Sequence, residues 1–218
     1  MNNKSYRTSS IWGAIEIASM LITAPLARLW FNRWGASAEE RTRTLPGDDL
    51  IPSPKLSYTH AITIHAPATA IWPWLIQMGQ GRGGLYSYDG LENLVGCQIH
   101  SADNLIPEHQ NLKEGDHILF GPAEKHFPGQ VVREIQPEHA IVMVGLDPVT
   151  RQAAPNATWV FYLDQRSNGT TRLLVRGLNA YEPGLANHVI WHIVEPIAFV
   201  MERRMLKGIK ARVENSLT

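Results

Sequence analysis

Apolar residues recur at helical spacing through the last long stretch of the chain, about residues 187–216. The positions that share this face are Ile190, Ile193, Val194, Ile197, Met201, Met205 and Ile209. Charged residues fall on another face with the same period, which predicts an amphipathic helix of about 45 Å. Pro196 lies inside the pattern and lacks a backbone donor, so either one helix bends there or two helices meet. The apolar period continues past the proline without a change of phase, which favours one bent helix.

Upstream, runs of apolar and β-branched residues predict the strands against which this helix packs. The first run covers 58–65, and four more cover 130–135, 140–146, 158–163 and 171–176. The gaps between the last four have the length of hairpin turns, which predicts an antiparallel meander. Within 158–163 both alternating sets of side chains are apolar, so this sheet is expected to be covered on both faces or to form one wall of a hydrophobic cavity.

Two short helices are predicted between the first strand and the meander, over 68–78 and 87–95. Pro73 is expected to kink the first, and Ser87 or Asp89 to cap the second. The segment 79–84 between them has the G-x-G-x-x-G spacing of dinucleotide-binding loops. That motif requires a strand before it and a helix directly after it. Here a helix precedes the glycines, so a turn is the favoured interpretation.

The mostly apolar segment 11–31 predicts an N-terminal helix whose surroundings the sequence leaves open. Its length suits a membrane span, but Glu16 lies inside it, Pro25 interrupts it and Arg28 precedes its end. Glu16, Ser19 and Thr23 share one helical face, a pattern that fits an amphipathic helix lying on a membrane or on the protein itself. Packing against its own domain or a partner is favoured over membrane contact through residues 11–31.

Three regions follow from these patterns. Residues 1–34 form the N-terminal helical region, residues 35–57 an extended connector rich in turn formers, and residues 58–218 the main domain. A cytoplasmic location is expected, with membrane association through the first helix as the alternative.

Composition and charge exclude several function classes. Lys plus Arg and Asp plus Glu each number 20, so no overall basic field attracts nucleic acid, and no nucleic-acid partner is expected. The single cysteine, Cys97, excludes an intramolecular disulfide and a Cys-based metal cage. His188, His192 and Glu195 are spaced to share one helical face and could hold a metal. No second cluster supplies further ligands, so neither a metal nor another cofactor is expected.

Several segments carry a resemblance to known proteins. They are Arg33-Trp34-Gly35-Ala36, Leu45-Pro46-Gly47-Asp48, Ile71-Trp72-Pro73-Trp74-Leu75, Gly79-Gln80-Gly81-Arg82-Gly83-Gly84-Leu85-Tyr86-Ser87-Tyr88-Asp89, Ile99-His100-Ser101-Ala102-Asp103 and Met201-Glu202-Arg203-Arg204-Met205-Leu206. With these segments and this order of elements, the chain resembles the SRPBCC superfamily over residues 33–215, and more narrowly a bacterial group within it of undefined function. That superfamily gathers START-like, Bet v 1-like and polyketide cyclase/dehydrase-like proteins. The resemblance implies an α+β helix-grip fold, in which a curved antiparallel sheet wraps around a long C-terminal helix.

The resemblance also implies an apolar cavity between sheet and helix that binds lipids, polyketides or other hydrophobic molecules, with a few polar groups fixing the ligand's orientation. The residues expected to bind the ligand are Tyr86, Tyr88, Asp89, Glu92, Trp159, Tyr162, Arg176 and His192. Plainer roles stay open for some of them. The two tyrosines would also suit the core or the rim, Asp89 a helix cap, and Arg176 a surface ion pair.

Two functions follow, and the first is favoured. A non-catalytic binder or carrier of a hydrophobic small molecule predicts an apolar pocket in which Asp89 and Glu92 point outward or cap helices. A cyclase- or dehydratase-type enzyme predicts titratable groups that converge inside the pocket, for instance Asp89, Glu92 or His192 acting with Tyr88. A module that uses only its surface is a third alternative. The sequence assigns no catalytic residue, ligand or oligomeric state.

Overall fold

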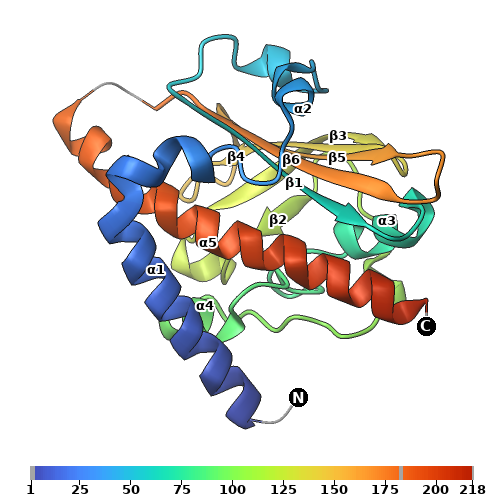
Figure 1. The fold of residues 1–218 in the computed structure, drawn as a ribbon. Coiled ribbons are helices and arrows are strands. Elements are labelled where there is room, and N and C mark those ends of the chain that lie inside the picture. The colour runs from blue at the N-terminus through green and yellow to red at the C-terminus, as the bar shows by residue number, and fades with distance from the viewer. Residues whose placement is uncertain (1–2, 182–183, 218) are drawn as a thin grey trace.

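The computed structural model describes residues 3–181 and 184–217, and side chains for all of these except 3–9, 186 and 188. Its centre is a six-stranded antiparallel sheet with the strand order β1-β6-β5-β4-β3-β2 (Figure 1). The strands are β1 Leu56–Ile64, β2 His117–Leu119, β3 Gly129–Gln136, β4 Ala140–Leu146, β5 Ala153–Gln165 and β6 Thr171–Asn179. The predicted antiparallel meander is confirmed for β3 to β6. β2 extends it at one edge by pairing with β3, and β1 pairs with β6 at the other.

Helices cover both faces of this sheet. They are α1 Asn3–Phe31, α2 Ala38–Thr42, α3 Ala68–Ile76, α4 Asp89–Leu94 and α5 Leu185–Ser216, with short 3-10 turns at Asp48–Leu50, Pro107–His109 and Ala123–Lys125. In Figure 1, α5 crosses one face, while α2 lies over the other. A single α5 passes through Pro196, so the two-helix alternative is wrong. The predicted α+β class, with an antiparallel sheet and a long C-terminal helix, is confirmed.

The connector is more ordered than its composition indicated. Residues 35–57 were expected to be extended, yet they hold α2 and a 3-10 turn. A capping box explains α2, because the Ser37 hydroxyl accepts from the Glu40 amide while the Glu40 carboxylate accepts from the Ser37 amide. Glu40 also accepts two hydrogen bonds from Arg172 on β6, each 2.7 Å long. The connector is thereby fixed to the outer face of the sheet. Residues 158–163 of β5 are mostly buried on both faces, and Trp159 also lines a pocket, so β5 has features of both predicted alternatives.

The main core lies between the sheet, α3 and the C-terminal half of α5. Trp74, Phe161, Leu206 and Ile209 are all buried there. A second cluster joins α1 to α4 and α5 through Met20, Phe31, Tyr88, Phe199 and Val200. One face of α1 therefore packs on its own domain, as favoured from the sequence, whereas the opposite face is exposed.

The close contact of α5 with the loop before α4 gives a test of this packing. A Cβ added at Gly208 would lie 2.2 Å from the backbone oxygen of Tyr86, so the two segments would have to separate. We expect Gly208→Ala to lower the free energy of unfolding by about 1–3 kcal/mol, despite the better helix propensity of alanine. Chemical denaturation measures this. The exposed Lys207→Ala next to it is the control, and an equally stable Gly208→Ala would contradict the contact.

Candidate ligand-binding pocket

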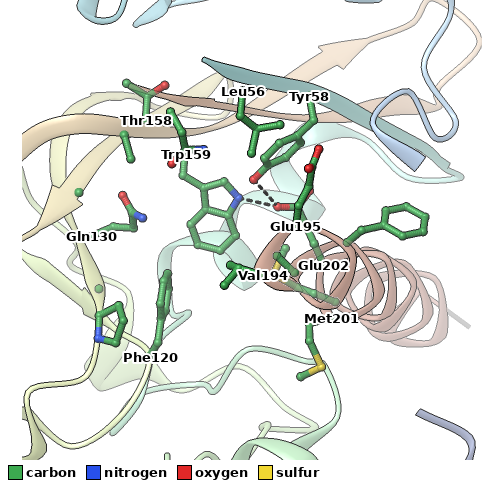
Figure 2. Close-up of a pocket in the computed structure, with 18 of the residues that line it drawn as sticks. Leu56, Tyr58, Phe120, Gln130, Thr158, Trp159, Val194, Glu195, Met201 and Glu202 are labelled. Carbon is green, nitrogen blue, oxygen red and sulfur yellow. Dashed lines mark hydrogen bonds between the residues drawn. The ribbon is translucent and has the colours of Figure 1, made fainter. Parts of the chain in front are cut away.

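A pocket of about 600 Å³ lies between the sheet and the N-terminal half of α5, partly open to solvent and lined mainly by apolar surface (Figure 2). Small residues on the strands, Gly129, Gly145 and Ala157, form part of its wall. Further along, α5 packs tightly on the sheet, with Leu206 and Ile209 fully buried. The C-terminal half of α5 therefore packs on the core, whereas its N-terminal half covers the pocket.

The carboxylate of Glu202, on α5, is the acceptor for the largest polar cluster in the pocket. It accepts hydrogen bonds from the Tyr58 hydroxyl (3.0 Å) and from the Trp159 indole nitrogen (2.8 Å), drawn as dashed lines in Figure 2. Nδ1 of His60 lies 2.5 Å from its other oxygen. These bonds join α5 to β1 and β5. Burial, and then the Glu202 carboxylate, raise the pKa of Tyr58 well above its usual value, so this hydroxyl stays protonated and donates.

His60 connects this cluster to the end of α1. Its Nε2 lies 2.8 Å from the backbone oxygen of Phe31, which can only accept, so Nε2 carries a proton. Nδ1 then faces Glu202, which leaves one proton between the imidazole and the carboxylate whichever group formally holds it. The pocket wall therefore contains a buried acid–base pair that shares a proton.

Glu92, on α4, is a second polar group of the pocket. It is only 8% exposed, and its Oε2 has no hydrogen-bond partner in the protein. Burial, and then the nearby charge of Asp89, raise its pKa to about 8. Near neutral pH Glu92 is therefore mostly an uncharged acid that can donate a hydrogen bond. Cys97 also lines the pocket, and burial, followed by the Glu92 charge, raises the pKa of its thiol.

Gln130, on β3, is a third polar group of the pocket. The hydroxyl of Thr158 does not join it, because Thr158 pairs with Leu178 of β6 and its side chain therefore lies on the outer face of the sheet with that of Arg172. Gln130 Oε1 is buried without a partner in the protein. In Figure 2 Gln130 lies on the side of the Trp159 indole away from Glu202. Buried polar atoms normally have partners, so a ligand or water is expected here.

Of the eight residues expected to bind the ligand, Glu92 and Trp159 line the pocket and the other six do not. Tyr86 is fully buried beside it, where its hydroxyl donates to the Trp74 carbonyl at 3.0 Å and accepts from Gln77 at 2.9 Å. Tyr88 donates to Glu16 of α1 at 3.0 Å. Both side chains hold the helices around the pocket in place.

The remaining four expected residues also lie outside the pocket. Asp89 is not the cap of α4, because the cap position is Tyr88, and its carboxylate instead accepts from the Ser101 amide and hydroxyl. Tyr162 packs edge-on against His139, and His192 is exposed on α5. Because none of these groups enters the pocket, the expected pairing of Tyr88 with Asp89 or His192 as a proton shuttle has no support in the geometry.

Arg176 faces the connector rather than the pocket. Its guanidinium donates to the backbone oxygens of Glu40, Arg41 and Arg43, to Thr59 and to Asp48. The plainer role of an ion pair therefore applies, extended by three backbone contacts that hold residues 40–48 on the outer face of the sheet.

Sequence reasoning missed several polar side chains of the pocket, namely Tyr58, His60, Gln130 and Glu202. One signal was present. Glu195 and Glu202 are seven residues apart, two helical turns, and both fall on the buried side of α5. A carboxylate at a buried position of an amphipathic helix requires a partner in the core. That requirement points to donors on the opposing strands.

The proposed metal face on α5 gains no support. Glu195 accepts hydrogen bonds from Arg28 of α1 and from Asn32, which directly follows α1, and the side chain of His188 lies outside the described residues. Among the residues that are described, no group of three or more His, Cys, Asp or Glu side chains is arranged to hold a metal. The glycine segment 79–84 is a closed turn in which Gly79 and Gly84 exchange two backbone hydrogen bonds, so the favoured interpretation is confirmed.

Comparisons with known proteins show likeness only at the level of solved structures. No family model matches the chain, and no curated protein matches it. A protein from Mycobacterium smegmatis is 14% identical, over 74% of this chain and 92% of that one, with a TM-score of 0.45. CalC, a self-sacrificing resistance protein from Micromonospora echinospora, is 10% identical over 73% and 95%, with a TM-score of 0.43. The Aha1 dimer protein from Colwellia psychrerythraea is 15% identical over 68% and 93%, with a TM-score of 0.38.

These likenesses carry no argument about function, because each TM-score is below 0.5 and each identity is low. The α+β architecture rests on the strand order and helix placement of the chain itself.

Removing the Glu202 carboxylate tests how much its hydrogen-bonded cluster contributes to the free energy of unfolding. Glu202→Leu leaves the Tyr58 and Trp159 donors buried without an acceptor, so we expect a loss of about 3 kcal/mol or more in the free energy of unfolding. Glu214→Leu on the same helix is the matched control, since Glu214 pairs with the more exposed His65 and Lys210. This substitution should lower the free energy of unfolding by less than about 1 kcal/mol. Equal losses in urea titrations would contradict the role of Glu202.

The raised pKa of Glu92 predicts a pH dependence of stability. The folded state keeps this proton up to about pH 8, whereas the unfolded chain releases it near the ordinary value of 4.5. Between these values the folded state binds more protons, so this group's contribution makes the free energy of unfolding fall as pH rises, by at most about 1.4 kcal/mol per unit.

Glu92→Gln keeps the shape of the side chain and removes the titration. Urea titrations at about pH 5 and about pH 8 should therefore show a smaller fall in the variant than in the wild type. Glu124→Gln, at an exposed position, should behave like the wild type. If the free energy of unfolding falls equally between these pH values in Glu92→Gln and in the wild type, Glu92 is already ionised in the folded protein.

Proposed function

We propose that this chain binds a hydrophobic small molecule, lipid- or polyketide-like, in the pocket between the sheet and α5. The observation that carries the proposal is an apolar pocket of about 600 Å³ that contains buried polar atoms without partners. Such a volume suits a drug-sized or single-chain lipid-like molecule. The sequence resemblance to the SRPBCC superfamily supports the same class of ligand.

The polar atoms indicate what kind of apolar molecule fits. Glu92, largely neutral near pH 7, offers a hydroxyl donor, while the Gln130 side-chain oxygen offers an acceptor across the pocket. A purely aliphatic ligand would leave these groups unsatisfied, which disfavours it by about 1–3 kcal/mol per group. The preferred ligand therefore carries hydroxyl, carbonyl or neutral carboxyl oxygens at more than one position.

An enzyme acting on such a molecule is the second candidate, because Tyr58, His60 and Glu202 form a proton-sharing cluster inside the pocket. Binding without reaction is favoured because these three groups already satisfy one another. Glu202 accepts from both neighbours and from Trp159, so no donor of the cluster is left aimed at a substrate. In an enzyme, Tyr58→Phe would abolish conversion of an added substrate while leaving its binding intact.

Blocking the pocket mouth tests the binding proposal. Ala198 lies on α5 at the pocket and is exposed, so Ala198→Phe adds a ring across the opening without burying it in the core. Titration with dansylated undecanoic acid, read by dansyl emission, should give one site per wild-type chain, and Ala198→Phe should weaken it at least about tenfold.

Ala211→Phe is the matched control, because Ala211 is also exposed on α5 but does not line the pocket. It should bind the probe like the wild type. If both variants bind equally well, the probe lies elsewhere and the pocket is not its site.

A further inference from the structure

The outer face of α1 is apolar from one end to the other. Between residues 11 and 30 the exposed positions are Ile11, Trp12, Ala14, Ile15, Ala18, Ser19, Ile22, Thr23, Pro25, Leu26, Leu29 and Trp30. Leu26 is 94% exposed and Ile22 is 80% exposed. At 100° per residue, most of the large side chains among them fall within about one third of the helix circumference. A contiguous apolar surface of this kind marks an interaction site.

The charged residues of this helix segment, Glu16 and Arg28, point the opposite way, toward the protein. Glu16 accepts from Tyr88, the residue before α4, and forms an ion pair with Arg203 of α5. Near the other end, Arg28 donates to both oxygens of Glu195 on α5, each at 3.1 Å. A helix at a water-facing surface has the reverse arrangement, with its charges outward. The neighbour of the outer face of α1 is therefore expected to be apolar.

The tryptophans of this face favour a bilayer over another apolar partner. Trp12 and Trp30 are both more than half exposed on it, and a helix lying in the membrane plane would hold both indoles at the depth of the headgroups. Between them the large exposed side chains are aliphatic only. Tryptophan favours the boundary between headgroups and acyl chains.

The outer side of α5 continues this surface. Val189, Ile190 and Ile193 are each at least half exposed, whereas Arg204 and Lys207 occupy the same side of the helix further along. The apolar stretch belongs to the end of α5 that contacts α1 through Glu195, and Figure 1 shows this end beside the last turns of α1. Basic groups thus border an apolar surface, the arrangement that fits acyl chains flanked by lipid phosphates.

We propose that the outer face of α1, together with residues 189–193 of α5, docks the protein on the surface of a lipid bilayer with α1 lying in the membrane plane. The 22-residue segment Ser10–Phe31 is also long and apolar enough to cross a membrane. Crossing would require α1 to leave the domain, which would separate Arg28 from Glu195 and carry Glu16 into hydrocarbon. The in-plane position keeps both ion pairs.

Docking also orients the pocket. Trp191, Val194 and Ala198 line the pocket on the same turns of α5 that expose Ile190 and Ile193. An apolar ligand could then pass between bilayer and pocket with little exposure to water. This consequence rests on the proposed function, but the docking does not, and it is measured without any pocket ligand.

Vesicle flotation of the full chain tests the proposal. Vesicles of phosphatidylcholine with phosphatidylglycerol should carry the wild-type protein to the top of a density gradient. Leu26→Glu, at the most exposed position of the face, should lower the bound fraction at least about tenfold at a matched lipid concentration. Val149→Glu is the control, because Val149 is 71% exposed on the β4–β5 connection and should leave binding unchanged. Both variants should keep the wild-type melting temperature and dansyl-probe binding.

Lipids brominated along their chains give a second readout. They should quench part of the tryptophan emission, and the combined change Trp12→Phe and Trp30→Phe should remove most of that quenching.

Each of the following results would overturn the proposal. If the wild type does not float, or if Leu26→Glu floats like the wild type, the face does not dock on lipid. If the wild type does not float but forms a dimer that Leu26→Glu dissociates, the occupant is a second copy of the chain. If the vesicle-bound protein resists alkaline carbonate extraction, α1 spans the bilayer instead of lying in its plane.

Discussion

The structure depends on one buried carboxylate, that of Glu202. It lies on the face of α5 that meets the sheet, where an unpaired charge would be strongly destabilising. The cost of burying this carboxylate is offset by hydrogen bonds with the Tyr58 hydroxyl, the Trp159 indole and the His60 imidazole. Through His60 the same cluster reaches the last residue of α1. One acceptor thus sets the distance between α5 and the sheet at the point where the pocket begins.

On one side of that point the interior is filled, and on the other it is open. Toward the C-terminus, α5 packs with Leu206, Ile209 and Val213 fully buried. Toward its N-terminus α5 instead covers the pocket, whose wall includes the small residues Gly129, Gly145 and Ala157. A folded domain rarely keeps an apolar space of this size without a use for it. The unpartnered oxygens around the pocket also indicate a ligand, because without one each would be a buried polar group that lacks a hydrogen bond.

The sequence predicted the elements well because their signals are local. The helical period of α5 and the apolar runs of β4 and β5 are visible in the residues themselves. The connector was misjudged because a five-residue helix has no measurable period, although the capping box of Ser37 and Glu40 was there to be recognised.

The site was harder to predict because its residues meet only through the register of distant strands. Tyr58 and Trp159 reach Glu202 because β1 and β5 both pair with β6, which brings their side chains under the same turn of α5. Arg176 shows the converse. A lone arginine on a strand looks like a ligand-binding group until the sheet face it occupies is known, and here that face carries the connector. Which face a strand residue occupies follows from the fold, not from the residue type.

The central claim is that the space under α5 holds an apolar molecule, and native mass spectrometry of the detergent-free protein tests it most directly. The account predicts chains that carry one apolar molecule each, or stripped chains that take up one molecule from a panel of single-chain lipids and polyketides and then melt at a higher temperature. A bare chain mass with every member of the panel, together with an unchanged melting temperature, would contradict it.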